Sequence, residues 1–276
     1  MSPQLPAPRR VRFDAIGEAW RLYMTDMAQW ICGVLLAGII AAAPVIVIEL
    51  IVFAVFVPGG MFGGGAATLG STDRIQSFRS ASLIIAFVAL PFNACTQLLT
   101  VGLQRRALLQ ARGLPSAITD MFSLGGMGLH VLVFNVLAAI IGLPWQLYYA
   151  YAHDPANPFS LFEPTHAAVL GGIAIAMGAI HVLIGFTPLI IVDQRLAVGP
   201  ALTKSVTTFA PQFLPLVGVL ICTYLLAFCG AIACGIGVLF TLPVLMTLYG
   251  VIYNDFFRPN QVATADQPTG WYPRPG

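Results

Sequence analysis

The chain has 276 residues, of which 58% are hydrophobic and only 9% are charged. A soluble domain typically carries about 25% charged residues, so this composition excludes a water-soluble fold with an ordinary polar surface. The net charge of +2 is too small to indicate nucleic-acid binding. The sequence therefore predicts an integral membrane protein whose main partner is the lipid bilayer.

Six apolar segments are long enough to cross a ~30 Å hydrocarbon core at ~1.5 Å per residue. They are residues 30–56, 81–103, 128–151, 167–192, 213–229 and 236–256. Between Lys204 and Asp255 the chain has no charged residue, and one helix of that length would be ~75 Å long. We therefore predict two spans there, joined by a glycine-rich turn at 230–237, with a re-entrant or broken helix as the alternative.

The basic residues predict the orientation, because Lys and Arg beside membrane spans are retained in the cytoplasm. With the N-terminus inside, Arg74 and Arg79 are the only basic residues outside, and all the others are cytoplasmic. Both termini are then cytoplasmic. The first 29 residues carry charges throughout, so we expect no cleavable leader. Residues 1–257 are predicted to form a single polytopic membrane domain, and 258–276 a disordered, proline-rich cytoplasmic tail.

Each odd-numbered span follows a segment with helical periodicity and mixed polarity. These segments align as Ala15-Ile16-Gly17-Glu18, Ala117-Ile118-Thr119-Asp120 and Ala201-Leu202-Thr203-Lys204. The even-numbered spans share a proline, at Pro91, Pro188 and Pro243. This pattern predicts an all-α membrane protein. Its six transmembrane helices form three like-oriented hairpins, each preceded by a cytoplasmic interfacial amphipathic helix.

Three stretches carry a likeness to known sequences: Ala15-x-x-x-Ala19-Trp20, Ala201-x-x-x-Ser205, and Gly235-Ile-Gly-Val-Leu-Phe-Thr-Leu-Pro243. In these the chain resembles a loose group of bacterial integral membrane proteins, the YciC-like proteins and the membrane domain of some glycerophosphodiester phosphodiesterases. The resemblance implies a six-span module of the bacterial inner membrane with an unassigned role. It carries over no catalytic residue, and the phosphodiesterase catalytic domain is missing from these 276 residues.

The second span carries a polar stripe, which is costly if it faces lipid. Its members recur at i, i+4, i+7 and i+11 and are Asn93, Gln97, Thr100 and Gln104. Counted from the cytoplasmic ends of the spans, Asn93 and His181 lie at a depth of ~16 Å, and Gln97 and Asn135 at ~10 Å. We therefore predict Asn93–His181 and Gln97–Asn135 as interhelical pairs.

Two further polar residues leave alternatives open. His181 shares a face of its span with small residues, so we expect it to face protein. There it is either a hydrogen-bonded packing residue or a proton-relay or substrate contact. Glu49 either snorkels to the outer headgroups or is a buried functional carboxylate. The prolines inside the spans are either packing kinks or hinges for alternating access.

No sequence motif of an enzyme, metal site or cofactor site is present. His153-Asp154 and Glu163-x-x-His166 are the nearest approach to a metal site, and an ordinary polar loop is the preferred interpretation. We therefore expect no cofactor, no metal and no enzyme activity.

Among the possible functions, a noncatalytic membrane module, acting as scaffold, envelope factor or partner subunit, ranks first. A small-solute or lipid transporter using a polar path near Asn93, Gln97 and His181 ranks second, and an intramembrane enzyme third. A cavity of several hundred Å³ that reaches Asn93 and His181 would favour the transporter. A centre packed with side chains would favour the noncatalytic membrane module.

Overall fold

A computed structural model describes residues 10–56, 71–152, 157, 160, 163–232 and 237–257, and within these ranges nearly all of the chain is helical. The α-helices are α1 (Ala15–Thr25), α2 (Met27–Phe56), α3 (Ser71–Ala111), α4 (Gly128–Ala152), α5 (Pro164–Ile184), α6 (Thr187–Gln194), α7 (Val198–Phe209), α8 (Phe213–Ile232) and α9 (Gly237–Phe257). Two short 3-10 helices, η1 (Ile118–Phe122) and η3 (Ala210–Gln212), lie in the connections. The predicted all-α fold is therefore confirmed for the described residues.

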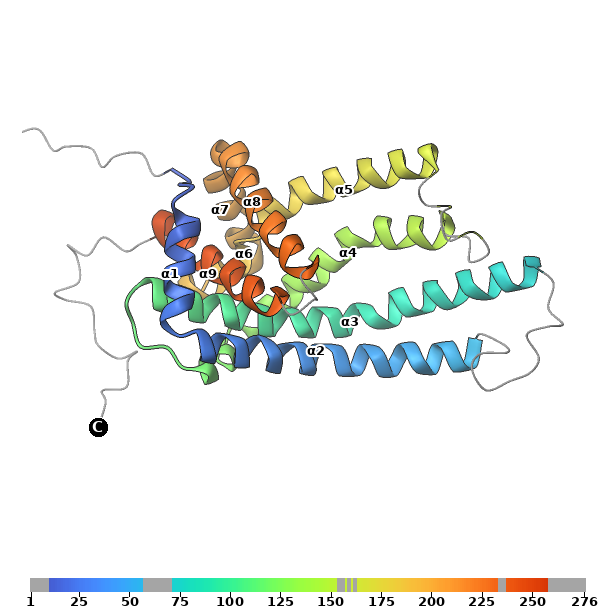
Figure 1. The fold of residues 1–276 in the computed structure, drawn as a ribbon, viewed down its shortest axis with the longest axis horizontal. Helices are drawn as coiled ribbons and strands as arrows, with labels where there is room; N and C mark the ends of the chain where they lie inside the picture. The colour runs from blue at the N-terminus through green and yellow to red at the C-terminus, as the bar shows by residue number, and fades with distance from the viewer. Residues whose placement is uncertain are drawn as a thin grey trace, which may run out of the picture.

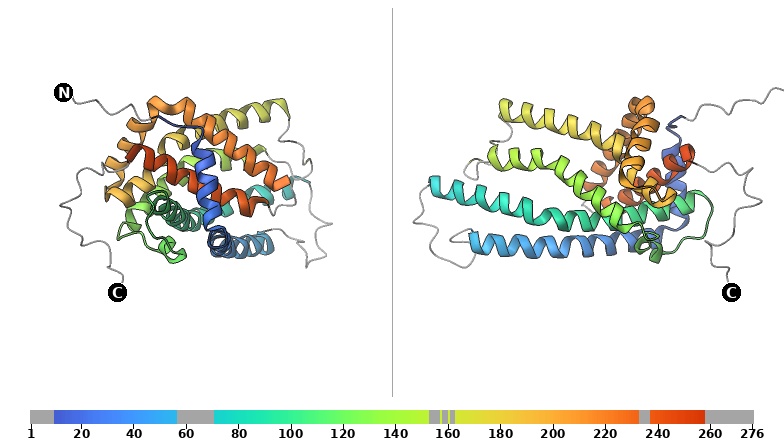
Figure 2. Two further views of the ribbon diagram at one scale, coloured as in Figure 1. Left: turned by 60° about the vertical axis from the view of Figure 1, so that its left-hand side comes forward. Right: turned by 180° about the vertical axis from the view of Figure 1, so that it is seen from behind.

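Helices α2, α3, α4 and α5 run side by side along the long axis of the molecule (Figure 1). The remaining helices gather at one end of these four, where α1 crosses the ends of the long helices (Figures 1 and 2). α9 packs against α1, α3 and α8 there. The bundle is therefore closely packed at this end, which we call the packed end, and contains only the four long helices at the other.

Five helical segments are long and apolar enough to cross a membrane by length and composition. They are Met27–Pro44, Gly128–Ala152, Pro164–Gln194, Val198–Leu226 and Leu239–Phe257. The remaining predicted span, 81–103, lies within α3, a continuous helix of 41 residues. At ~1.5 Å per residue α3 is ~60 Å long, about twice the hydrocarbon thickness. The predicted tail at 258–276, and residues 233–236 of the predicted turn, lie outside the described residues.

The predicted span 167–192 is divided into two helices. α5 ends at Ile184 and α6 begins at Thr187, with Pro188 in its first turn. Proline has no N–H to donate to the carbonyl four residues earlier, which here is that of Ile184. By contrast, Pro44, Pro91, Pro144 and Pro243 all lie inside continuous helices.

The prediction of a second amphipathic α-helix is wrong, because the segment after Pro115 contains only the 3-10 helix η1. Gly113 precedes it and Gly125 and Gly126 follow it, all with positive φ, so the backbone turns at both ends. A 3-10 helix of this length is a turn rather than an interfacial helix.

Helices α1 and α7, the first and third predicted pre-span helices, bury equivalent positions. The buried residues are Ala15, Ala19 and Tyr23 in α1, and Ala201, Ser205 and Phe209 in α7. Because the sequence alignment pairs Ala15 with Ala201, these residues correspond one to one. The shared burial supports an internal repeat for these two units.

A buried arginine ties the corner between α1 and α2 to α3. Arg106 donates to Asp26 Oδ2 at 2.8 Å and to Gln29 Oε1 at 3.0 Å, and lies 4.7 Å from the centroid of the Trp30 ring. Burial lowers the pKa of Arg106, and the Asp26 carboxylate opposes that shift. The Trp30 indole donates to Gln110 Oε1 at 3.0 Å, which adds a second link to α3.

We predict that Arg106→Lys lowers the stability of the protein by about 2 kcal/mol or more, because an ammonium cannot replace the forked contacts and ring stacking of the guanidinium. Arg21→Lys on the exposed face of α1 is the control. Thermal unfolding in detergent micelles measures both. Equal melting temperatures for the two variants would contradict the structural role of Arg106.

A second close contact joins α3 to α9. A Cβ atom added at Gly250 would lie 2.7 Å from the backbone carbon of Ala107 and 2.8 Å from the Leu108 nitrogen. Glycine at 250 therefore lets the backbones of α3 and α9 approach, as small residues do between membrane helices.

We expect Gly250→Ala to destabilise the protein by about 1–3 kcal/mol, because two backbones must separate to admit the methyl group. Gly178→Ala in α5 is the matched control, since no atom lies within 4 Å of its added Cβ. Thermal melts monitored by size-exclusion chromatography compare them. If Gly178→Ala is as harmful as Gly250→Ala, the close α3–α9 contact is not what holds the two helices.

Candidate functional site

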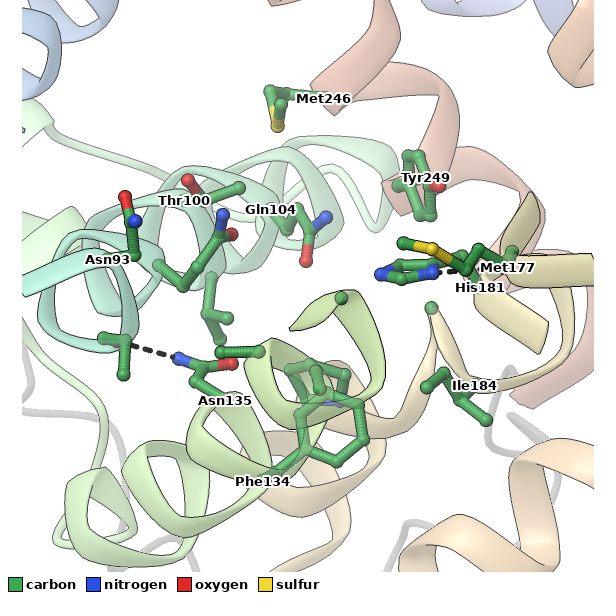
Figure 3. Close-up of a pocket in the computed structure, with 18 of the residues that line it drawn as sticks. Asn93, Thr100, Gln104, Phe134, Asn135, Met177, His181, Ile184, Met246 and Tyr249 are labelled. Carbon is green, nitrogen blue, oxygen red and sulfur yellow. Dashed lines mark hydrogen bonds between the residues drawn. The ribbon is translucent and has the colours of Figure 1, made fainter. Parts of the chain in front are cut away.

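A cavity of about 550 Å³ lies between α3, α4, α5 and α9, with α6 and α8 also contributing. Figure 3 shows polar residues on both of its sides. Its polar lining residues are Asn93, Gln97, Thr100, Gln104, Asn135, Gln146, His181, Tyr224 and Tyr249. Volumes of roughly 300–1,000 Å³ are typical of ligand pockets, so the cavity is large enough to hold a small molecule.

The stripe predicted on the second span forms one wall of this cavity. Residues 93, 97, 100 and 104 lie on successive turns of α3, and all four line the hollow. In Figure 3, Thr100 and Gln104 lie between Asn93 on one side and Tyr249 on the other. The four residues therefore share one face of α3, as their helical spacing predicted.

Gln104 is the most unusual of the lining residues. Only 7% of its surface is exposed, and its Oε1 atom is buried without a hydrogen-bond partner. Burying a polar atom unpaired costs roughly 1–3 kcal/mol. Because Oε1 is an acceptor, a ligand that satisfied it would have to supply an N–H or O–H group.

His181 and Tyr249 line the side of the cavity opposite Asn93 (Figure 3). His181 Nδ1 lies 3.0 Å from the Met177 carbonyl oxygen, one turn earlier in α5. A histidine nitrogen that contacts a carbonyl oxygen carries the proton, so Nδ1–H donates and Nε2 is the nitrogen left for another partner.

Asn135 has a structural contact in the cavity wall. It is 5% exposed, and its Nδ2 donates to the Ala94 carbonyl at 3.2 Å. This bond joins α4 to α3 beside Asn93. Asn135 therefore holds α4 against α3 in the cavity wall, whereas the Oε1 atom of Gln104 has no hydrogen-bond partner.

The structure brings the predicted residues Asn93, Gln97, Asn135 and His181 to one cavity but does not pair them as predicted. Their described side chains make no Asn93–His181 or Gln97–Asn135 hydrogen bond, and Asn93 and His181 lie on opposite sides of the hollow (Figure 3). The pairing was wrong because equal depth in the bilayer does not imply contact. Glu49 lies in α2, but its side chain is outside the described part of the structure.

Sequence reasoning missed Gln146, Tyr224 and Tyr249 as lining residues. A signal for Gln146 was present, because it follows Asn135 by eleven residues, as Gln104 follows Asn93. Eleven residues are close to three helical turns, so each pair shares a face. The two tyrosines carry no comparable signal, since aromatic residues are common in membrane spans.

A polar network at the packed end lies beyond the cavity along α3. Arg112 makes a two-point ion pair with Asp193, with N–O distances of 2.6 and 2.9 Å. The Tyr253 hydroxyl donates to Asp193 Oδ2 at 2.9 Å and accepts from Gln194 Nε2 at 3.1 Å. Lys204 donates to Gln194 Oε1 at 2.5 Å. Helices α3, α6, α7 and α9 are thereby joined at this end.

No group of three or more metal-ligating side chains occurs among the described residues. His166 Nδ1 contacts the Tyr148 hydroxyl at 2.9 Å. His153 and Asp154, which the sequence placed in the same candidate loop, lie outside the described ranges.

Comparisons with known proteins assign no family to the chain: no family model matches it, and neither a curated protein nor a solved structure does. The resemblance to the YciC-like group therefore stays a prediction.

We predict that Gln104→Met is at least as stable as the native chain, because it removes the unpaired acceptor at nearly constant volume. Asn135→Leu is the contrasting variant and should lose about 1 kcal/mol with its bond to the Ala94 carbonyl. Melting temperatures in the same detergent compare the two. A large loss in Gln104→Met would show that the glutamine side chain holds the fold together.

Proposed function

We propose that this protein is a membrane transporter that admits a small polar molecule, or the polar part of a larger one, to a cavity inside its helical bundle. The observation that carries the proposal is the cavity of about 550 Å³ reaching Asn93 and His181. Polar groups inside a membrane protein are costly and usually serve a substrate pathway.

The chemistry of the lining supports binding rather than catalysis. Among the described lining residues there is no Asp, Glu, Lys, Arg or Cys. The walls offer amides, hydroxyls and one histidine, which recognise a ligand by hydrogen bonds. A nucleophile with an adjacent base, the usual arrangement for covalent catalysis, has no counterpart in this set.

The break between α5 and α6 supplies a hinge beside the cavity. Gly185 and Pro188 both line the hollow, and a Cβ added at Gly185 would lie 3.5 Å from the Tyr249 ring. Interrupted helices at a midplane site recur in transporters, where halves of a bundle move about a fixed ligand. Of the predicted prolines, Pro188 is thus the one with a role in gating.

We further propose six spans with both termini in the cytoplasm, beside the packed end. Arg12 donates to Asp255 at 3.0 and 3.1 Å, which brings residues from the two ends of the described chain together. Burial lowers the pKa of Arg12, but the hydrogen bonds and charges of the surrounding carboxylates, Asp255 first among them, raise it overall. The Arg106 and Arg112 ion pairs also lie at this end, as basic residues do on the cytoplasmic side.

The outer face of α1 supports its placement in the membrane interface. Its exposed large apolar residues are Trp20 and Met24, one helical turn apart, and the flanking Phe13 and Met27 are exposed as well. A helix that buries alanines against protein and exposes such residues lies flat in the headgroup region.

Cysteine labelling tests the proposed function. In a variant without native cysteines, His181→Cys faces the cavity, and Ile180→Cys is its neighbour at the same depth, 41% exposed and not part of the cavity lining. Methanethiosulfonate reagents need a hydrated thiolate. We expect a water-soluble reagent of this class to modify His181→Cys at least about tenfold faster than Ile180→Cys.

Transport requires that the site be reached from both sides of the membrane in turn. The same reagent, made membrane-impermeant, is applied separately to right-side-out and inside-out vesicles. We expect His181→Cys to be labelled in both. Labelling from one side only would contradict transport, and equal slow labelling of both variants would favour the noncatalytic module.

A further inference from the structure

A second hollow adjoins the polar cavity on the other side of α3. It is an apolar groove of about 590 Å³ between α2, α3 and α9. Three residues, Gln97 and Thr100 of α3 and Met246 of α9, line both hollows. The groove and the cavity therefore meet between α3 and α9.

The groove faces the surrounding bilayer. Leu35 and Ile39 of α2 line it and are 42% and 66% exposed. Gly38 lies between them, and no atom is within 4 Å of a Cβ added there. An apolar channel open at the side of a membrane protein is accessible to lipid tails, whereas a polar solute gains nothing from it.

The polar cavity excludes a headgroup with a net charge. A bare phosphate is normally held by Arg, Lys or a row of backbone N–H groups. No cationic or anionic side chain belongs to the described part of the lining, so an unbalanced charge would be desolvated without a counter-ion. A zwitterion or a neutral group is compatible with amides and hydroxyls.

The unpartnered Oε1 of Gln104 narrows the headgroup further. This atom is buried in the wall of the cavity and accepts hydrogen bonds only (Figure 3). The headgroup therefore needs an N–H or O–H donor. A primary ammonium has one, whereas a quaternary ammonium such as choline has none.

We propose that the ligand is a membrane lipid whose headgroup has no net charge and carries a hydrogen-bond donor. The headgroup occupies the polar cavity and donates to Gln104, and an acyl chain lies in the groove between α2, α3 and α9. Gln97, Thr100 and Met246 border the passage between the two. The inference rests on the proposed function, since it names the class of molecule that the cavity admits.

Photo-crosslinking tests where the acyl chain lies. A phosphatidylethanolamine with a diazirine in its acyl chain is added to the full-length protein in phosphatidylcholine nanodiscs, and the cross-linked peptides are mapped by mass spectrometry. We expect adducts at residues 34–42 and 239–246. Gly38→Trp fills the groove and should abolish them, whereas Gly171→Trp, an equally open position in α5, should not. Adducts spread over the outer faces of α4 and α5 would overturn the proposal.

Competition tests the headgroup. Unlabelled phosphatidylethanolamine should displace the probe about tenfold better than phosphatidylcholine or phosphatidylglycerol, and Gln104→Met should remove that preference. A melting temperature for Gln104→Met no lower than the native one separates lost recognition from lost folding. Equal competition by all three lipids would overturn the choice of headgroup. If His181→Cys is labelled fast but the lipid probe does not cross-link, the lipid ligand is contradicted and the proposed transport function is not.

Discussion

The close approach of α3 and α9 at Gly250 is the constraint on which the rest of the structure depends. With no side chain at 250, the two backbones touch beside Ala107, and α9 then lies where Met246 and Tyr249 reach the polar cavity. Arg106, the residue before Ala107 in α3, fixes the corner between α1 and α2. The packed end is thus held by backbone contact and buried hydrogen bonds, and its helices α6, α8 and α9 line the cavity together with α3, α4 and α5.

The stable packed end lies beside a cavity whose wall contains a buried polar atom without a partner. Arg106 and Arg112 have their charges balanced by Asp26 and Asp193. Gln104, only one turn before Leu108, has an acceptor that no described group satisfies. Tyr23 and Asn254 also have buried polar atoms without a partner, but of these three residues Gln104 alone lines the cavity, where a ligand can relieve the cost.

Much of the fold was predictable because lipid enforces long apolar helices. The starts of α4 at Gly128 and α8 at Phe213 and the end of α2 at Phe56 agree with the predicted spans. The polar wall was predictable from the spacing of Asn93 and Gln104. The break before Pro188 and the short turn at η1 were not, because tertiary packing decides which prolines interrupt a helix and which glycines turn the chain. Whether Asn93 and His181 contact each other depends on how each helix is rotated about its axis, and depth in the bilayer does not determine that rotation.

The central claim is that a polar cavity inside the bundle holds a ligand at Gln104. The most direct test is an experimental structure of the protein in nanodiscs that contain phosphatidylethanolamine. We predict continuous density from the groove between α2, α3 and α9 into the cavity, with a polar group in hydrogen-bond contact with Gln104 Oε1. Side chains of α3, α4 and α5 packed together with no space between them would contradict the claim.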